Sequence, residues 1–283
     1  MKPAQTVGPD YDARIRRARH LTSAHPFASE VLTFYLQIAA FQKKLYGRVQ
    51  AYRENQPTAR ADGQFRSELN LAMLLPHFPE LLSLLESAGP EPVANAAREL
   101  AAQNSASWIA LLTDFWSFGG RPVVSDGTAQ EPDEPLKNFV ARAFLQPYSE
   151  FLAARMLGNQ LEATYRVCPV CGSAPLLGVL RPEGDGGKRY LVCSFCLREW
   201  GFRRIFCAAC GEDSEGKLPV YVAEQFPHVR VEACDTCKSY VRTIDLTKNG
   251  NAVPVVDDLA AIPLSLWAHE HGYTRLAANL LET

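Results

Sequence analysis

The chain has 283 residues, of which 47% are hydrophobic and 21% are charged, a balance typical of soluble globular proteins and not of disordered ones. Its formal net charge of −2 gives no positive field that would draw it to nucleic acid or to an anionic membrane. The sequence opens without an apolar signal-peptide core, and no apolar run approaches the ~20 residues that a membrane-spanning helix needs. We therefore expect a cytoplasmic protein in a reducing compartment, without membrane insertion.

The first part of the chain, residues 1–164, has the character of a helical domain. Its opening residues are polar and interrupted by proline, and we expect them to lie on the surface. Four stretches of helical periodicity follow, with breaks or kinks predicted at Pro76, Pro79 and Pro147, and their aromatic stripes are typical of a core. A polar loop rich in Pro, Gly and Asp is predicted at 121–134. The helical stretches lie at 28–57, 65–85, 93–120 and 136–163.

The character of the sequence changes at Tyr165, where helical periodicity stops and short β-like runs begin. Residues 182–187 read PEGDGG, which is typical of a hairpin tip, and Lys248-Asn-Gly250 marks a turn at the end of the module. The tail, residues 251–283, predicts two short helices that pack back onto one of the domains. The β-like runs lie at 176–180, 189–192, 218–222 and 229–231.

All eight cysteines lie in this second part, and every one belongs to a Cys-x-x-Cys pair. Two cysteines at this spacing can turn both thiolates toward one point, as a tetrahedral metal requires. In a reducing compartment such pairs bind metal or carry out redox chemistry more often than they form structural disulfides. Four pairs with no cysteine left over therefore predict two closed four-cysteine metal sites. The pairs are Cys168/Cys171, Cys193/Cys196, Cys207/Cys210 and Cys234/Cys237.

The module is an internal duplication with a repeat of about forty residues. Each half opens on a Cys-x-x-Cys-Gly motif (CPVCG, CAACG) and closes on a pair without glycine (CSFC, CDTC). Gly172 and Gly211 follow the opening pairs, where a tight turn directs backbone N–H groups toward sulfur. We interpret 165–205 and 206–250 as two modules of the zinc-ribbon or rubredoxin type. The duplication favours sequential pairing, with the first four cysteines on one metal and the last four on the other; a cross-braced arrangement, first pair with third, stays open.

The size of each ribbon explains why it needs a metal. About forty residues cannot bury enough apolar surface to fold alone, whereas four-thiolate coordination contributes on the order of 10–16 kcal/mol. We expect chelation to unfold 165–244 and to leave the helical domain largely intact. Four-thiolate shells accept zinc and iron with similar geometry, so the spacing alone does not choose between them, and zinc is the ordinary expectation.

Other motifs with a chemical appearance are better explained as structure. Residues 211–217, GEDSEGK, satisfy the first seven positions of a phosphate-binding loop, but leucine holds the eighth and three carboxylates would repel phosphate. His269 and His271 lack the four-residue spacing of a helical zinc site, so we expect surface or capping roles. Asp257 and Asp258 precede an apolar run, where a helix N-cap and a first-turn carboxylate explain both.

One cluster of interleaved arginine and aromatic residues has the composition of a single-stranded nucleic-acid site. We favour instead a solvated strand edge whose aromatic residues pack into the ribbon. No catalytic constellation emerges elsewhere in the sequence. The cluster consists of Arg198, Trp200, Phe202, Arg203, Arg204 and Phe206.

The cysteine module and the tail together resemble the FdhE-type formate dehydrogenase accessory proteins. The resemblance is carried by CPVCG…CSFCLREW…CAACG…CDTCKSYVRTID, then by VDDLA from Val256 and LWAHEHGY from Leu266, and ends at NLL. Four pairs in this order, followed by that tail, are specific, whereas any single pair is not. The helical first half is compatible with the family in length and character.

The resemblance implies a cytosolic maturation factor and not an enzyme. It implies that the partner is the catalytic subunit of formate dehydrogenase, bound before export and assembly. Because the family is associated with rubredoxin-like iron, the expected metal moves from zinc to iron, at two mononuclear four-thiolate sites, with zinc as the alternative. The ligand role falls on all eight cysteines, and the resemblance carries over no partner-binding residue.

Three functions therefore compete. The first is a metal-stabilised chaperone that holds a redox-enzyme subunit until its cofactors are inserted. The second is a rubredoxin-like protein that uses ribbon iron for electron transfer or redox sensing. The third is a nucleic-acid-binding ribbon protein, which the acidic balance disfavours. The sequence leaves the partner surface and the oligomeric state open.

Overall fold

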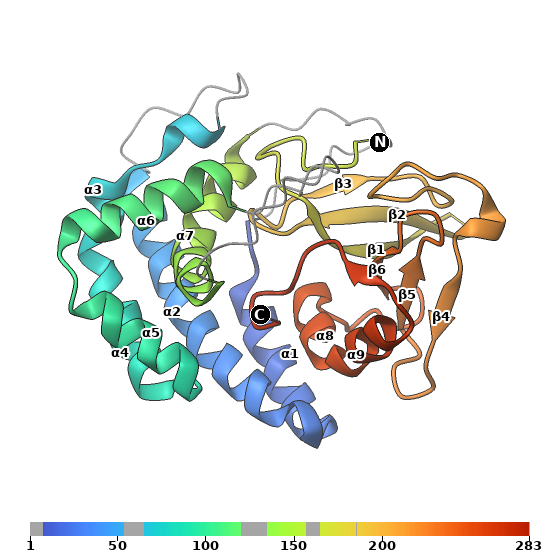
Figure 1. Ribbon diagram of the computed structural model, residues 1–283, viewed down its shortest axis with the longest axis horizontal. Helices are drawn as coiled ribbons and strands as arrows, with labels where there is room; N and C mark the ends of the chain where they lie inside the picture. Colours follow the sequence, from blue (N-terminus) through green and yellow to red (C-terminus); the bar gives the residue numbers. More distant parts are fainter. Residues whose placement is uncertain (1–7, 54–64, 120–134, 157–164, 185, 283) are drawn as a thin grey trace.

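A computed structural model describes residues 8–53, 65–119, 135–156, 165–184 and 186–282. Helices form one side of the molecule and a twisted sheet the other, with two short helices under one face of the sheet (Figure 1). The predicted fold class is confirmed: a helical N-terminal region, a sheet region with two four-cysteine clusters, and short C-terminal helices. The polar loop predicted at 121–134, and the predicted helix ends beyond residues 53 and 156, lie outside the described residues.

From residue 28 onward the helical region follows the predicted stretches, with one division that the periodicity did not reveal, and a helix that was not predicted, α1, precedes them. Asn104 starts a new helix inside the stretch at 93–120, because its side chain accepts a 3.0 Å hydrogen bond from the N–H of Ser107. Pro76 and Pro79 mark the break between α3 and α4, whereas Pro147 lies within the continuous helix α7. The helices are α1 (Tyr11–Ala24), α2 (Ser29–Arg53), α3 (Leu71–Leu74), α4 (Phe78–Ala88), α5 (Glu91–Ala101), α6 (Ser105–Phe118) and α7 (Pro135–Arg155). We find no helix in the described part of the chain whose length and apolarity would let it span a lipid bilayer.

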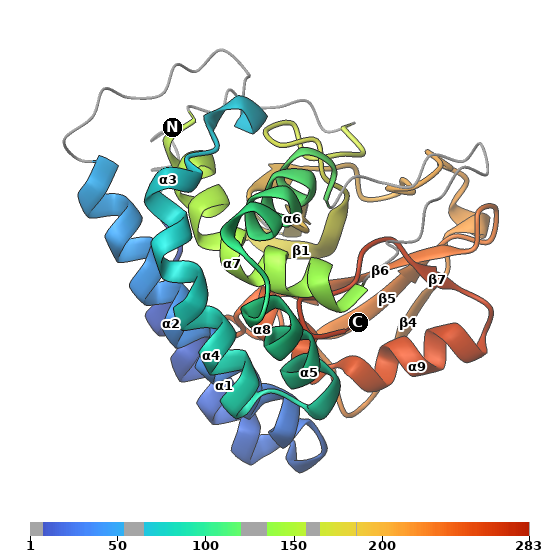
Figure 2. The ribbon, with the colours of Figure 1, turned by 60° about the vertical axis from the view of Figure 1, so that its left-hand side comes forward.

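The expectation that the opening residues lie on the surface is wrong for helix α1. Asp10 caps this helix by accepting a 2.8 Å hydrogen bond from the N–H of Ala13, and the helix runs beside α2 (Figure 2). Its buried face carries an arginine as well as apolar residues. Arg14 forms two hydrogen bonds, of 2.7 and 3.0 Å, with the carboxylate of Glu150 on α7. Because that partner lies 136 residues away, the local sequence around Arg14 predicts a surface residue.

The seven strands of the described residues form one mixed sheet in the order β3-β2-β1-β6-β5-β4, with β7 beside β6. Each cysteine half contributes a set of antiparallel strands, and the parallel pairing of β1 with β6 joins the two sets. At this join a Cβ on Gly178 would collide with the side chain of Thr243, so glycine permits the close approach. The strands are β1 (Pro175–Glu183), β2 (Gly186–Cys193), β3 (Glu199–Gly201), β4 (Val220–Val222), β5 (Val229–Ala233), β6 (Ser239–Asp245) and β7 (Thr274–Arg275).

The predicted β-like runs located β1, β2, β4 and β5 but did not include the short strands β3 and β7 or the central strand β6. Each of the four predicted β-like runs overlaps a strand, and the hairpin tip predicted at 182–187 connects β1 with β2. Strand β6 was not predicted, although it joins the two halves of the sheet. Its Arg242 is fully buried, and a charged residue at the centre of a short apolar run hides the strand pattern.

The two short helices predicted in the tail are α8 (Pro254–Ala260) and α9 (Ile262–Glu270). They contact both parts of the molecule and not only one. Helix α8 packs with α1 and α2 in one apolar cluster, and it also lies against β1 and β6. Helix α9 covers the other half of the same sheet face, where Trp267 packs against Tyr221 of β4.

Asp257 and Asp258 are centres of buried ion pairs, a role that the capping interpretation did not include. Asp257 does accept a 2.7 Å hydrogen bond from the N–H of Val253, as a first-turn carboxylate would. It also receives two hydrogen bonds, of 2.5 and 2.9 Å, from Arg17 of α1, and the Nε2 atom of His228 lies 2.8 Å away. The carboxylate therefore ties the first helix to the sheet and to the tail.

Asp258 holds the end of the chain in the same way. It accepts a 2.7 Å hydrogen bond from Arg242 of β6 and two, of 2.8 and 2.9 Å, from Arg275 of β7. Asn279 also donates to it, and Glu282 lies 3.0 Å from the Arg242 guanidinium. Burial alone would raise the pKa of Asp258, but the two arginines outweigh it and hold that pKa below its ordinary value.

Replacing Asp258 with alanine is expected to lower the free energy of unfolding by about 3–5 kcal/mol, because it leaves two buried guanidinium groups to share the one remaining carboxylate, that of Glu282. Urea unfolding followed by circular dichroism would measure the loss. Asp12→Ala is the matched control, because Asp12 pairs with Lys43 at an exposed site and its removal should change stability little. Equal stability of the two variants would contradict the prediction.

Candidate metal centres

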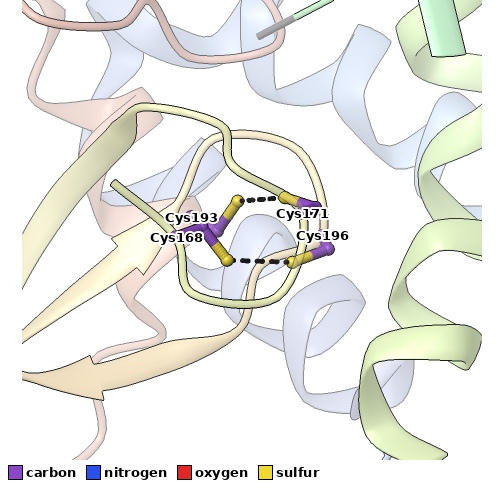
Figure 3. Close-up of side chains that lie close together, drawn as sticks. All are labelled: Cys168, Cys171, Cys193 and Cys196. Carbon is purple, nitrogen blue, oxygen red and sulfur yellow. Dashed lines mark hydrogen bonds between the residues drawn. The ribbon is translucent and has the colours of Figure 1, made fainter. Parts of the chain in front are cut away.

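The structure groups the eight cysteines into two clusters, each made of four consecutive cysteines. Within each cluster the four sulfur atoms all lie within 4.8 Å of one another. In the first, the closest Sγ–Sγ distances are 3.7 Å for Cys168–Cys196 and 3.3 Å for Cys171–Cys193 (Figure 3). In the second, Cys207–Cys237 and Cys210–Cys234 are both 3.7 Å apart. The sequential grouping is thus the one the structure adopts, and the cross-braced arrangement is not.

These distances suit a tetrahedral metal and not a disulfide. Metal–sulfur bonds of about 2.3 Å place the corners of a tetrahedron about 3.8 Å apart, whereas a disulfide bond is about 2.05 Å long. The sulfurs of the first cluster face one another between two loops (Figure 3). Four thiol donors in this arrangement could hold a zinc or iron ion, and the geometry does not separate the two.

The opening loops of the two clusters have the same backbone geometry. Gly172 and Gly211 lie in the left-handed region, with φ of 76° and 84°. Their N–H groups donate to the carbonyl oxygens of Cys168 and Cys207, at 2.9 and 3.1 Å. The predicted glycine turns therefore exist in both halves, and they curl each loop around its sulfurs.

The closing loops make a similar turn without glycine. Leu197 and Lys238 have φ of 52° and 56°, and they are the non-glycine residues with positive φ in the described part of the chain. Such a conformation costs about 1–3 kcal/mol and persists only where the surroundings impose it. Its occurrence at the equivalent position of both halves indicates that the convergence of the cysteines imposes it.

The first cluster lies inside the main hydrophobic core. Its cysteines are at most 4% exposed, and they belong to the same apolar cluster as helices α2 and α4–α7. The reason is Phe195, which stands between Cys193 and Cys196 and points into the helical region. Its ring centroid lies 5.4 Å from that of Trp116, 5.5 Å from that of Phe115 and 6.4 Å from that of Phe65.

Two arginines of the helical region hold the loops of the first cluster. Arg66 donates to the carbonyl oxygen of Cys171 at 3.0 Å, and Arg142 donates to that of Ser194 at 2.7 Å. Burial lowers the pKa of Arg142 to about 10, so its guanidinium stays charged at neutral pH. A divalent metal with four thiolates carries a net charge of about −2, and these cations would offset that charge.

The second cluster is more open. Cys207 and Cys234 are buried, but Cys210 is exposed and Cys237 is half-buried. A cavity of about 390 Å³ lies beside the cluster on the sheet, and Cys207 and Cys234 form part of its wall. The ion pair between Arg189 and Glu232, 2.6 Å long, also lines this cavity.

The pKa values of the cysteine thiols indicate how a bound cation would change their protonation. Burial raises the pKa of Cys193 and Cys196 well above the ordinary value, and it raises that of Cys207 to about 12. Hydrogen bonds from Cys168 and Cys193 instead hold the pKa of Cys171 well below it. Buried thiolates this close repel one another, so a bound metal would have to replace the protons that otherwise separate them.

The remaining sequence motifs have structural roles in the described residues. Trp200 and Phe202 are buried, so their rings are not available to stack on bases, and Arg198 donates to the carbonyl oxygen of Ala153 at 2.9 Å. The stretch at 211–217 leads from a cysteine loop into a short 3-10 helix, without the strand that precedes a phosphate-binding loop. His271 contacts the carbonyl oxygen of Trp267 at the end of α9, which is a capping position as expected.

Phe195→Ala tests the link between the first cluster and the helices. The change keeps the backbone N–H that donates to the Cys193 sulfur at 3.3 Å, but it empties the space between three aromatic rings. We expect a loss of about 3–5 kcal/mol in the free energy of unfolding, measured by denaturant titration of the helical signal. Leu266→Ala is the control, because that side chain is 63% exposed and its loss should matter little. If the denaturant unfolding transition of the helical signal is unchanged in Phe195→Ala, the stability of the helical core does not depend on its contact with the first cluster.

Metal binding at the first cluster is expected to weaken as the pH falls. Cys193 and Cys196 have raised pKa values, so both carry protons near neutral pH and must release them to bind metal. Two released protons correspond to an affinity loss of about 100-fold per pH unit. Competition against a chelator of known pH dependence, from about pH 8 to about pH 6, would measure it. An affinity independent of pH would show that the thiols are already ionised.

Comparison with known proteins gives the same picture over the whole chain. The model of the FdhE central domain matches residues 167–204, which hold the first cluster, and that of the FdhE C-terminal domain matches residues 205–281, which hold the second. An FdhE homolog from Aquifex aeolicus is 25% identical over 276 residues, covering 94% of this chain and 93% of the relative. An FdhE homolog from Pseudomonas aeruginosa is 34% identical over 152 residues, about half of each chain.

The fold matches as well as the sequence. The crystal structure of the FdhE protein from Pseudomonas aeruginosa superposes with a TM-score of 0.66 at 25% identity, and the match covers 98% of both chains. The helical region, the sheet and the tail are therefore shared with that protein, and not only the cysteine loops. The sequence motifs, the two domain models and this structural match agree: residues 167–281 match the FdhE central and C-terminal domains, and the chain is similar to FdhE proteins over nearly its whole length.

Proposed function

We propose that this chain is a cytoplasmic accessory protein for the maturation of formate dehydrogenase. In this role it binds the catalytic subunit and holds it while the subunit receives its cofactors. The match of residues 167–281 to the two FdhE domains supports the proposal, as does the resemblance to formate dehydrogenase accessory proteins in the motifs of both cysteine halves and the tail. The reducing cytoplasm suits the proposal, because it keeps eight thiols available for metal.

The observation that carries the proposal is the way the two four-cysteine clusters are built into one scaffold. Parallel pairing of β1 with β6 fixes the two clusters in one sheet, and Phe195 anchors the first cluster to the helices. A metal at each cluster would then order a surface that spans both halves of the molecule. Binding another protein on an ordered surface costs less conformational entropy than binding it on a mobile one.

We propose iron as the metal of both clusters, at two mononuclear four-thiolate sites, with zinc as the alternative. All eight cysteines serve as ligands. When bound, the metal supplies charge compensation for the thiolates and cross-links the loops of each cluster. Elemental analysis of the full chain purified without oxygen would read the metal directly, and a preparation with zinc alone would overturn the choice of iron.

The partner is tested by purifying a tagged full-length chain, without oxygen, from cells that produce formate dehydrogenase. We expect mass spectrometry to find the catalytic subunit in the eluate, and we expect Cys193→Ser or Cys234→Ser to reduce its amount because the loops lose order. Ser214→Ala is the matched control, since this exposed serine lies in the second half without contributing its side chain to a cluster. Failure to recover the subunit with the unaltered chain would overturn the proposal.

A second function is favoured by the exposure of Cys210. If iron occupies the second cluster, a partner can approach within contact of one of its ligands, as electron transfer requires. The chain would then act as a rubredoxin-like redox protein or sensor during maturation. Such a role demands a reversible change in the thiolate-to-iron absorption with a defined midpoint potential, and a colourless zinc protein excludes it.

A further inference from the structure

The two halves of the duplication have the same loops but very different surroundings. The four cysteines of the first cluster are 1%, 4%, 0% and 2% exposed. In the second cluster Cys210 is exposed and Cys237 is half-buried. Since both clusters have the same Cys-x-x-Cys spacing and the same turn geometry, the difference arises from what packs around the loops and not from the loops themselves.

The loops of the first cluster are held by side chains from the helical region. Arg66 and Arg142 donate to the carbonyl oxygens of Cys171 and Ser194, and the hydroxyl of Ser149 donates to that of Phe195 at 3.2 Å. These anchors come from residues 46 to 105 positions away, so the loops cannot open without disturbing the helical core.

The loops of the second cluster are held partly by exposed residues of the cluster's own half. The hydroxyl of Thr236 donates to Glu212 at 2.7 Å, and Lys238 pairs with Asp235 at 2.8 Å. From outside this half, Arg166 donates to the carbonyl oxygen of Ala209 at an exposed site. The tail holds the closing loop, because the hydroxyl of Tyr273 donates to Asp235 at 2.9 Å and the N–H of Thr274 donates to the carbonyl oxygen of Lys238 at 2.7 Å. The opening loop, which carries the exposed Cys210, has only the exposed Arg166 contact among these outside anchors, and such a contact contributes little to stability, so this loop can open locally.

The second cluster can also be approached from two sides. Cys210 and Cys237 face solvent, while Cys207 and Cys234 form part of the wall of the cavity on the sheet. Ligand exchange at a four-thiolate metal needs a position from which an incoming ligand can reach the metal or displace one sulfur. The second cluster offers such positions, and the first, enclosed by core side chains, does not.

We infer that the second cluster is an exchangeable site for a thiophilic divalent metal ion, whereas the first holds its metal for as long as the protein is folded. Exchange begins at Cys210. Its bond to the metal breaks as an incoming thiolate bonds to the same ion, and the released Cys210 thiolate takes a proton from water. The oxidation state of the metal does not change. The inference rests on the proposed metal loading of both clusters.

The experiment uses the full chain loaded with zinc, in which redox chemistry plays no part. A chromophoric chelator in excess reports zinc release over time, and N-ethylmaleimide added at intervals labels each cysteine that becomes free. We expect one zinc ion per chain to leave first and the second at least about tenfold more slowly, because its release needs opening of the core. Mass mapping should place the early labels on Cys207, Cys210, Cys234 and Cys237, with the helical circular dichroism unchanged.

A double variant isolates the first cluster. Cys210→Ser with Cys237→Ser is expected to fold, to bind one zinc ion and to lack the fast phase of release. If this variant does not fold, the labelling of the unaltered chain still decides the question. Release of both ions at one rate, or early labels on Cys168, Cys171, Cys193 or Cys196, would overturn the inference. A zinc content below two ions per chain would instead contradict the proposed metal loading of both clusters. The order in which the cysteines are labelled tests the exchange inference separately from that loading.

Discussion

The convergence of four cysteine sulfurs on one point, twice in the chain, is the constraint on which the rest of this structure depends. It bends each cysteine loop through a left-handed residue, and it does so at Leu197 and Lys238, where no glycine relieves the strain. Four thiolates this close repel one another unless a cation lies among them, so the same geometry that shapes the loops could also hold a metal ion. The cysteine loops connect directly to strands of the sheet: β2 ends at Cys193, and β6 begins at Ser239, shortly after Cys237.

The duplication did not produce two independent ribbons. The parallel pairing of β1 with β6 merges the halves into one sheet, and the first cluster shares its core with the helices. The expectation that the helical region would survive metal removal therefore changes for the first cluster. Loss of metal there would loosen the loop that carries Phe195, and with it the aromatic contacts of Phe65 and Trp116.

A second set of constraints is electrostatic. Arg17, Arg242 and Arg275 converge on two adjacent carboxylates of α8, so the first helix, the central strand and the end of the chain meet at one buried site. Such pairs add less stability than equally packed apolar residues, but breaking one partner leaves a buried charge. They therefore favour one arrangement of the elements over alternatives in which these charges are unpaired.

The sequence by itself determined the features that depend on near neighbours. The Cys-x-x-Cys spacing and the repeat identified both clusters and their sequential grouping, because each ligand pair is local and the two halves are alike. Helical periodicity located α2 and α7, since an apolar stripe depends only on residues a turn apart.

Tertiary structure decided the features that depend on distant partners. Arg14 and Arg242 are buried because Glu150 and Asp258 meet them, and without those partners α1 and β6 read as surface segments. The different exposure of the two clusters also follows from packing, because only one cysteine loop carries a phenylalanine at the position that faces the helices. Spacing defines a metal site, whereas the neighbours that fold onto it decide whether that site is closed or open.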